Sequence, residues 1–318
     1  MKRLNCLVLG GAGFIGSYVA NALVTRGHKV RVFDRPRINS NNLSSVIPHI
    51  EFISGDLSNE SDIANALEGV DIAVHLISTT IPAVSNVNPI YDVETNIVGT
   101  IRFLTLAKNA GVKKVVFASS GGTVYGEPLI LPIPESHPTN PICSYGITKL
   151  AIEKYLHLFY CLHGLDYSIL RIANPYGERQ NTNGELGVVA VFLWKVLNGQ
   201  PITIWGNGEV ARDYFYISDL VAAFVRVIEG YTPSKIYNIG GGRAYSLNQI
   251  LDAIRSVTEM SVMVNYTSAR KLDVSINYLD ITRAKTELSW IPQVPLNVGI
   301  ERTWDFLMKL DTDNSRGV

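Results

Sequence analysis

The stretch "SYGITK" holds a tyrosine at position 145 and a lysine at position 149. In a helix, residues four apart lie on the same face, one turn above the other. A phenol is a weak base at its ordinary pKa of about 10, but a nearby ammonium favours the phenolate and lowers that pKa. Tyr145 and Lys149 are therefore a candidate pair for proton transfer, although the same spacing also arises by chance on the solvent face of ordinary helices.

A run of hydroxyl side chains precedes this pair by about 25 residues, in "VVFASSGGTVYG" (115–126). Its apolar start predicts a strand, which ends at Ser119 and Ser120 and is followed by two glycines and Thr123. In parallel sheets, ligands bind beyond the carboxyl ends of the strands. We therefore expect these hydroxyls to face the same crevice as Tyr145, where one of them could hold a substrate oxygen.

A glycine-rich turn lies near the start of the chain, in "LVLGGAGFIGSYVANAL". Gly11, Gly13 and Gly16 satisfy G-x-G-x-x-G, and Gly10, Gly13 and Gly16 satisfy the related G-x-x-G-x-x-G. Such glycines let the backbone turn sharply between a strand and a helix and approach a pyrophosphate, whose charge then lies at the helix N-terminus. The predicted contacts with a dinucleotide are therefore Gly10, Gly13, Phe14, Ile15 and Gly16.

Asp34 ends the next predicted strand, about 20 residues after the glycines, where an acid binds the adenosine ribose hydroxyls. Its charge would repel a 2′-phosphate and favours NAD over NADP, whereas Arg35 beside it weakens that preference. A bound NAD would also place a cationic nicotinamide ring where it further favours the Tyr145 phenolate.

Two further strand ends are candidates for cofactor contacts. "GDLSN" (55–59) places Asp56 and Leu57 near an adenine, although Asp56 could equally cap the following helix. "HLIS" (75–78) contains Leu76, a cofactor contact, and a histidine that we expect to be structural.

Strand and helix candidates alternate through the first two thirds of the chain, which predicts parallel strands joined by crossover helices. Strands are expected at 4–10, 29–34, 50–56, 70–77, 113–120, 167–174 and 235–241, and helices at 14–26, 60–68, 92–110, 145–163 and 187–198, with another from Ser246. The predicted fold is a Rossmann-type doubly wound sheet (1–175, with a return segment at about 214–245). A smaller C-terminal α/β lobe (176–213 and 246–318) would bind substrate.

The bulk composition is that of an ordinary globular protein, with 47% hydrophobic and 18% charged residues. Lysine plus arginine equals aspartate plus glutamate at 28 each, which gives no reason to expect nucleic acid or an anionic membrane as a partner. The three cysteines are far apart, so neither a disulfide framework nor a metal site is expected. No segment has the roughly 18 apolar residues of a membrane span, and we expect a cytoplasmic protein.

The combined pattern resembles the extended short-chain dehydrogenase/reductase family, and within it the nucleotide-sugar 4-epimerases. The resemblance covers nearly the whole chain and rests on the motifs GGAGFIG (10–16), GDL (55–57), SSGGTVYG (119–126), YGITK (145–149), NPYG (174–177), RDYFYISDL (212–220), YNIGGG (237–242) and LSWIPQVPLNVGI (288–300), with Asp34 and Asn96.

The resemblance implies a role for each matching residue. Tyr145 is the general base, and Lys149 tunes it while holding the nicotinamide ribose; Asn96 is a cofactor contact. Counting from the strand end selects Ser120 as the catalytic hydroxyl, whereas counting back from Tyr125 selects Thr123, and the choice stays open. The residues that grip the uridine diphosphate are Asn174, Arg212, Arg270 and Asp273.

Departures from the family pattern bear on the substrate. Dehydratases and decarboxylases carry an acid where this chain has Gly122 and Thr123, which favours simple hydride chemistry. Asn277 matches the position whose bulk gates acetamido sugars, and Arg179 could meet a uronate or a phosphate.

The resemblance thus implies NAD-dependent 4-epimerisation of a UDP-hexose, and no metal is expected. The surplus apolar residues of the helix at 145–163, among them Ile147, Leu158 and Leu162, could form the seam of a homodimer or belong equally to the internal core. The rivals are epimerisation of a UDP-N-acetylhexosamine or UDP-glucuronate, a reductase or lyase on the same scaffold, and a non-catalytic NAD-sensing protein.

Overall fold

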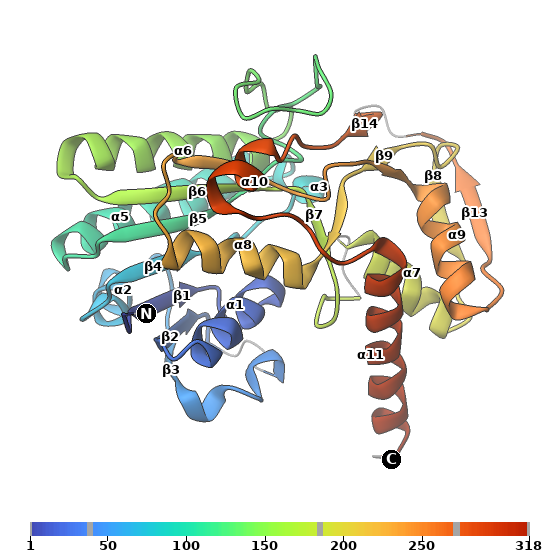
Figure 1. Ribbon diagram of the computed structural model, residues 1–318, viewed down its shortest axis with the longest axis horizontal. Helices are drawn as coiled ribbons and strands as arrows, with labels where there is room; N and C mark the ends of the chain where they lie inside the picture. The colour runs from blue at the N-terminus through green and yellow to red at the C-terminus, as the bar shows by residue number, and fades with distance from the viewer. Residues whose placement is uncertain (1, 37–40, 183–186, 270–273, 317–318) are drawn as a thin grey trace.

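The computed structural model describes residues 2–36, 41–182, 187–269 and 274–316. A seven-stranded parallel sheet forms its centre (Figure 1), in the order β11-β6-β5-β4-β1-β2-β3. The bounds are β1 (Asn5–Leu9), β2 (Lys29–Asp34), β3 (Ile50–Ser54), β4 (Ile72–His75), β5 (Lys114–Ser120), β6 (Asp166–Ile172) and β11 (Ile236–Ile239). The strand order reverses between β1 and β4, which opens a crevice at their carboxyl ends. The predicted Rossmann-type fold is confirmed.

Helices cover both faces of this sheet, and the central strands β1, β4 and β5 are buried on both sides, whereas the edge strand β3 is largely exposed. On one face lie α1 (Phe14–Thr25) and α8 (Ile217–Glu229), packed on residues such as Val8, Val74 and Val116. On the other lie α2 (Glu60–Leu67), α5 (Gly99–Asn109) and α6 (Ser144–His163), packed on Leu7 and Phe117. Figure 1 shows α5 and α6 on the side of the sheet opposite α8 and α1.

The single helix expected at 92–110 is instead three pieces. A four-residue helix α4 (Pro89–Asp92) runs into a π-helical segment η3 (Val93–Val98) and then into α5. The side chain of Asn96 donates to the carbonyl of Asp92 at 3.1 Å, within this widened turn. π-turns of this kind often occur at functional sites. Short helices α3 (Pro82–Ser85), η1 (Asn41–Leu43) and η2 (Ile47–His49) complete this half.

The second half of the chain adds three small sheets beside the carboxyl edge of the main sheet (Figure 1). Their strands are β7 (Asn174–Tyr176), β8 (Ile202–Trp205), β9 (Ala211–Arg212), β10 (Tyr214–Tyr216), β12 (Tyr245–Ser246), β13 (Val264–Thr267) and β14 (Ile276–Asn277). The helices are α7 (Val188–Leu197), α9 (Leu247–Thr258), α10 (Thr282–Leu288) and α11 (Leu296–Arg316). Ser246 begins α9 through a capping box with Gln249. The strand predicted at 167–174 divides into β6 and β7.

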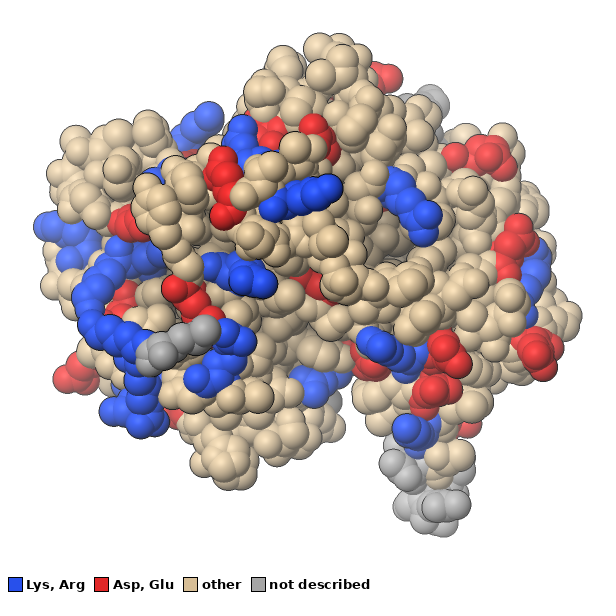
Figure 2. Space-filling view, in the orientation of Figure 1, with Lys and Arg blue, Asp and Glu red and all other residues tan. Residues whose placement is uncertain are grey.

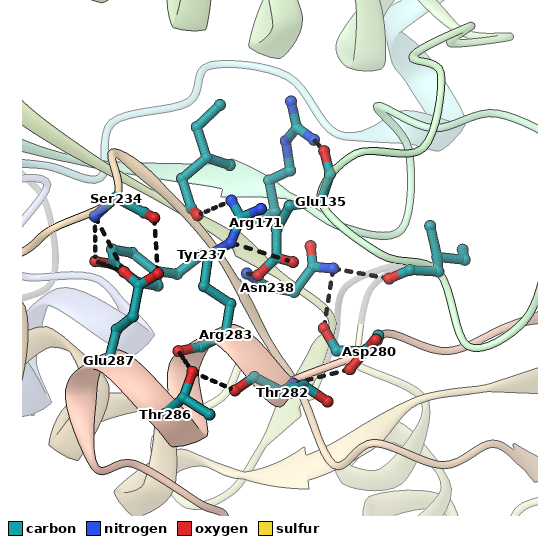
Figure 3. A network of polar contacts seen from close by, with 12 residues as sticks. Glu135, Arg171, Ser234, Tyr237, Asn238, Asp280, Thr282, Arg283, Thr286 and Glu287 are labelled. Atoms are coloured by element: carbon teal, nitrogen blue, oxygen red, sulfur yellow. Dashed lines mark hydrogen bonds and ion pairs between the residues drawn. The ribbon is translucent and has the colours of Figure 1, made fainter.

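A buried polar network ties the β6–β11 edge of the sheet to the later segments (Figure 3). The amide of Asn238 donates to the carbonyls of Ile133 and Asp280, at 2.8 and 3.2 Å, and its backbone N–H donates to Glu135. Arg283 lies 3.7 Å from the other oxygen of Glu135. Because Asn238 is fully buried, its bonds fix the position of β11 relative to residues 133–135 and to the start of α10.

The surface carries both signs of charge (Figure 2), with Lys and Arg gathered over the side of the sheet that contains β1, β2 and β3. A cavity of about 550 Å³ lies there, lined by residues at the amino ends of these strands, including Arg3, Lys29 and Arg31. It opens at the opposite edge of the sheet from the crevice. Within the described part of the chain, no helix is long and apolar enough to cross a membrane.

Candidate active site

The glycine turn joins β1 to α1 and leaves the start of the helix open. Gly10 adopts φ = +80°, and a Cβ on Gly16 would lie 2.2 Å from the Gly10 carbonyl oxygen, so α1 can pack on the turn only without a side chain there. No side chain caps α1, and no acid stands in its first turn. Phe14 and Ile15 form that first turn, and its backbone N–H groups fit the pyrophosphate of a dinucleotide.

Asp34 lies directly against this turn. It is buried (5% exposed) at the end of β2, and its carboxylate accepts from the N–H of Ala12 at 3.0 Å and of Arg35 at 2.9 Å. The side chain of Arg35 is exposed. A carboxylate fixed beside the turn is the group expected to meet ribose hydroxyls. The residues present therefore fit a dinucleotide.

The structure separates the two readings of Asp56, because Asn59 caps α2 through the N–H groups of Ser61 and Asp62. Asp56 is exposed and accepts from the N–H of Ser58 at 2.7 Å, and the hydroxyl and N–H of Ser58 lower its pKa. The alternative in which Asp56 caps α2 is wrong, and a role at the adenine stays a prediction.

The remaining predicted cofactor contacts lie around the crevice. Leu57 is buried beneath Gly99, where a Cβ would come within 3.2 Å of it. Leu76 directly follows β4, is partly buried and packs against the apolar core on the α1 side of the sheet. Asn96 is buried and accepts from the N–H of Thr79 at 3.0 Å, so in this chain it also holds the segment after β4.

His75 ends β4 and is fully buried, with its Nε2 3.0 Å from Thr100 Oγ1. Burial, together with the Lys149 ammonium, lowers its pKa to about 3. Burial therefore keeps this histidine neutral, but its Nδ1 has no partner among the described residues, and the structural role expected for it stays a prediction.

Tyr145 and Lys149 lie on one face of α6, as the helical spacing predicts. The ammonium of Lys149 is buried, donates to the Ala118 carbonyl at 3.0 Å, and lies 5.5 Å from the centre of the Tyr145 ring. Burial lowers the pKa of Lys149 to about 8, while Asp92 and Glu153 act in the opposite direction. Half the Lys149 side chains would thus be neutral near pH 8.

The pKa of Tyr145 is raised, by burial first and then by Cys143 and Asp92. Without a bound cofactor, the Lys149 ammonium is therefore not sufficient to ionise Tyr145. The positive charge of a nicotinamide ring has to supply the rest of that stabilisation.

The first turn of α6 is held by residues of another helix. Its own cap position, Cys143, offers no side-chain bond. Instead, Asn86 Oδ1 accepts from the N–H of Ser144 at 2.8 Å, and Ser85 Oγ accepts from the N–H of Tyr145 at 3.1 Å. Helix α3 and the residue after it thus cap α6 from outside and fix the backbone of Tyr145.

The structure separates the hydroxyls at the end of β5. Ser119 is buried and donates to Glu153 at 2.6 Å, which withdraws it from the crevice. Ser120 is the last residue of β5, and its carbonyl accepts from Val124 at 3.2 Å. Thr123 Oγ1 is buried without a hydrogen-bond partner among the described residues. Such an orphaned oxygen calls for a partner that a ligand would supply.

A second orphaned oxygen lies beside the same turn. Asn277 is buried, its Nδ2 donates to the Gly121 carbonyl at 3.5 Å, and its Oδ1 has no partner among the described residues. Arg212 is its register partner on the neighbouring strand β9. The predicted substrate residues Asn277 and Arg212 are therefore neighbours on adjacent strands, and Asn277 is bonded to the turn that contains Thr123.

The other predicted substrate residues are more dispersed. Asn174 begins β7 and donates through its side chain to the Asp213 carbonyl at 3.3 Å. The guanidinium of Arg179 lies 4.3 Å from the centre of the Tyr18 ring and 3.5 Å from Ser17 Oγ, beside α1. It therefore lies against the helix of the dinucleotide turn. Arg270 and Asp273 lie outside the described residues.

Sequence reasoning missed Asp213, next to Arg212. It is buried and accepts from Gly241 N at 2.5 Å and Leu279 N at 3.1 Å, which joins three segments at the crevice. Burial raises its pKa to about 6, against the opposing effect of these amides. Gly240 is required because a Cβ there would lie 2.4 Å from Asp213 Oδ2. The signal available in the sequence was the presence of both RDY (212–214), which contains Asp213, and IGGG (239–242), which contains the glycines beside it.

Comparisons with known proteins agree with this geometry. Residues 6–240 match the model of the NAD-dependent epimerase/dehydratase family. A UDP-glucose 4-epimerase of Mycolicibacterium smegmatis is 36% identical over 95% of this chain and 98% of its own length. A dTDP-4-dehydro-6-deoxyglucose reductase of Escherichia coli is 34% identical over 95% and 96%. A crystal structure of UDP-glucose 4-epimerase with UDP-glucose from Thermotoga maritima superposes with a TM-score of 0.92 and 37% identity, over 96% of this chain and 99% of that one.

Proposed function

The chain belongs to the NAD-dependent epimerase/dehydratase family, and from this premise we propose that it interconverts the 4-epimers of a UDP-hexose. It is a nucleotide-sugar-modifying enzyme with NAD as its cofactor. What the family leaves open is the reaction, because relatives of nearly equal identity include an epimerase and a reductase. The crevice argues against loss of a group, and the demand for added reductant distinguishes the epimerase from the reductase.

Bound NAD would accept a hydride from the sugar C4 and return it. The residues of the chain would do the rest. Tyr145 takes the proton of the 4-hydroxyl, and the Lys149 ammonium stabilises the phenolate. The hydroxyl of Thr123 or Ser120 holds the 4-oxygen, and Arg212 holds a phosphate of the diphosphate. Rotation of the 4-keto sugar about its diphosphate would present the opposite face, and the proton would return from Tyr145.

The observation that carries this proposal is the orphaned Thr123 Oγ1 in a turn without an acid. Elimination or decarboxylation needs an acid or a base besides the tyrosine, whereas here the turn offers a hydroxyl beside glycines. A hydroxyl can hold an alcohol and the ketone derived from it equally well. Such a site favours reversible hydride transfer without loss of a group.

The sugar is proposed to be a hexose whose 2-substituent is small. Asn277 fills the position that gates acetamido groups and is fully buried, with its amide nitrogen on the Gly121 carbonyl. A uronate would need a cation at the sugar, but Arg179 lies beside α1 and is better placed for a cofactor or substrate phosphate. These contacts favour UDP-glucose and UDP-galactose over the two rival sugars.

The test is incubation of the purified protein with UDP-glucose, UDP-N-acetylglucosamine and UDP-glucuronate in separate reactions without added reductant, followed by chromatography of the products. We expect UDP-galactose from UDP-glucose and NAD that copurifies with the protein. Stoichiometric consumption of NADPH would assign a reductase instead, and release of water or carbon dioxide a lyase. A Tyr145→Phe variant that turns over at the wild-type rate would contradict the assigned base. Absence of turnover with all sugars, together with bound NAD, would favour a non-catalytic NAD sensor.

We also propose a homodimer formed through α6. The helix packs on the sheet through Ile152, Leu156 and Phe159, whereas Ile147 and Leu162 are 53% and 65% exposed. An apolar stripe turned to solvent on a long helix suits a partner copy. Light scattering coupled to size exclusion should give twice the chain mass for the wild type and one chain mass for Leu162→Glu.

The division into a cofactor domain and a substrate lobe at 176–213 and 246–318 remains a proposal as well. It is supported by the small sheets, which contain β8, β9, β12, β13 and β14 and lie outside the main sheet.

A further inference from the structure

Asp92 ends α4 and is buried completely, within a ring of donors. One carboxylate oxygen accepts from Thr80 Oγ1 at 2.5 Å and Asn96 Nδ2 at 2.9 Å. The other accepts from Ser144 Oγ at 2.6 Å and Thr148 Oγ1 at 2.8 Å. An ionised carboxylate has only acceptor sites, so four donors suit its charged form.

Two of these donors belong to the N-terminal end of α6 and flank the tyrosine in sequence. Ser144 precedes Tyr145 and Thr148 follows it by three residues, so one carboxylate oxygen binds the helix on both sides of the tyrosine. Together with the bond from the Tyr145 N–H to Ser85, this leaves little freedom to the turn. A rigid turn is what places a general base within reach of its proton.

The charge of Asp92 acts on the same pair. Asp92 and Glu153 are the two carboxylates that raise the pKa of Lys149 against its burial, but Glu153 is already ion-paired with Arg171 at 2.6 Å. Among the described residues, no ion pair engages Asp92, so its charge is available to the Lys149 ammonium.

The other titratable groups that face the pair do not replace this charge. His75 on β4 is neutral because its pKa is lowered to about 3, and burial raises the pKa of the Cys143 thiol ahead of α6. Both groups therefore carry no charge near neutral pH.

We propose that Asp92 is a positioning residue for proton transfer: its carboxylate holds the first turn of α6 on both sides of Tyr145 and balances the buried ammonium of Lys149. This inference rests on the proposed role of Tyr145. It concerns a residue whose side chain is fully buried and whose proposed effect passes through Tyr145 and Lys149.

Asp92→Asn separates charge from shape. The asparagine carbonyl can accept from Thr80 and Asn96, and its NH₂ group can donate to the hydroxyls of Ser144 and Thr148, which then act as acceptors. Thr148→Val is the matched control, because it removes one of the four bonds and keeps the charge. Loss of a negative charge lowers the pKa of Tyr145 and of Lys149 alike.

The first measurement is the pH dependence of turnover. The limbs of the pH profile that report the ionisation of Tyr145 and of Lys149 should both move to lower pH by about one unit in Asp92→Asn. Thr148→Val should lower turnover without moving either limb. A purely structural Asp92 would lower turnover in both variants and leave both limbs in place, and that result would overturn the inference.

The second measurement does not depend on turnover. The phenolate absorbance of NAD-saturated protein minus that of its Tyr145→Phe counterpart is titrated in the wild-type and Asp92→Asn backgrounds. A lower midpoint in Asp92→Asn supports the inference even if no UDP-sugar is converted. Equal titrations, including no ionisation in either protein over the range in which both stay folded, count against it.

A double-mutant cycle covers the case in which Asp92→Asn folds poorly. Lys149→Met leaves the Asp92 charge unbalanced, and the double variant removes both charges. The double variant should therefore be more stable in urea than the sum of the single effects predicts. Strict additivity would show that the two charges do not balance each other and would overturn the inference.

Discussion

The ion pair between Glu153 and Arg171 provides the sharpest test of how the site is supported. Both side chains are almost fully buried, at 2% and 3% exposure. Glu153 accepts from Arg171 Nε at 3.0 Å and Nη2 at 2.6 Å, and from Ser119 Oγ at 2.6 Å. In Glu153→Gln, one position of the new amide must present an N–H to a guanidinium N–H, whichever way the amide is turned.

The expected cost follows from this geometry. Removing one partner leaves a guanidinium charge buried and incompletely paired, which costs about 3 to 5 kcal/mol. That is a large share of the roughly 5 to 15 kcal/mol by which a typical domain is stable. Tyr125 keeps its bond to Arg171 at 3.0 Å and cannot replace the charge. Because Ser119 precedes Ser120, the end of β5 should loosen too.

The assay is urea unfolding at 25 °C, followed by tryptophan fluorescence and circular dichroism. The control is Asp252→Asn, which breaks the i,i+3 pair with Arg255 on α9, where the two side chains are 72% and 45% exposed. Exposed pairs contribute about 0.2 to 1 kcal/mol, so this variant should unfold near the wild type. A Glu153→Gln protein whose unfolding free energy is within about 1 kcal/mol of the wild type would refute the desolvation argument.

Three further outcomes are expected. Gly16→Ala should lose bound NAD, because the new Cβ would lie 2.2 Å from the Gly10 carbonyl oxygen. Gly122→Ala, whose new Cβ would come no closer than 3.9 Å to Ser120 Oγ, should keep it, and equal NAD content of the two variants after acid release would argue against the assigned turn. Thr123→Val should not lower the free energy of unfolding, because the buried hydroxyl has no partner among the described residues to lose, yet it should reduce turnover. Full turnover in this variant, with loss in Ser120→Ala, would transfer the role to Ser120. His75 has a pKa of about 3 in the folded protein against 6.5 in the unfolded chain. The unfolded chain therefore binds the extra proton, so stability is full above about pH 6.5 and falls by about 1.4 kcal/mol per pH unit between 6.5 and 3. His75→Leu should lose less stability in that window, and identical slopes of unfolding free energy against pH in the two proteins would contradict the buried neutral state.

The main sheet could be predicted from the sequence because its central strands are short apolar runs buried on both faces. The run at 29–34 coincides with β2. The predicted helix at 92–110 was wrong in part because local periodicity cannot reveal a π-segment, which here accompanies bonds from Asn96 to Asp92 and Thr79. Propensity carries no information about such side-chain bonds.

In the candidate site, too, the residues set by local periodicity could be predicted and those set by tertiary contacts could not. The face shared by Tyr145 and Lys149 follows from helical period alone. The groups that hold this face could not be found in this way, because Asn86 contacts Ser144 across 58 positions of sequence. The role of Asp213 likewise depends on amides that the fold brings from two distant segments. Residues that carry chemistry have recognisable types and spacing, whereas their supports are ordinary polar residues identified by contact alone.

The external cap of α6 has a consequence for local opening of the fold. The N–H groups of Ser144 and Tyr145 can exchange their hydrogens with solvent only when the bonds to Asn86 and Ser85 break. Both acceptors belong to a four-residue helix and the residue that follows it, and so short an element has few bonds of its own to keep it closed. Amide protection at the start of α6 should therefore follow the opening of α3, even though the later turns of α6 are anchored in the core. Exchange at these two amides would therefore report the opening of α3, whereas exchange in the later turns of α6 would report the core.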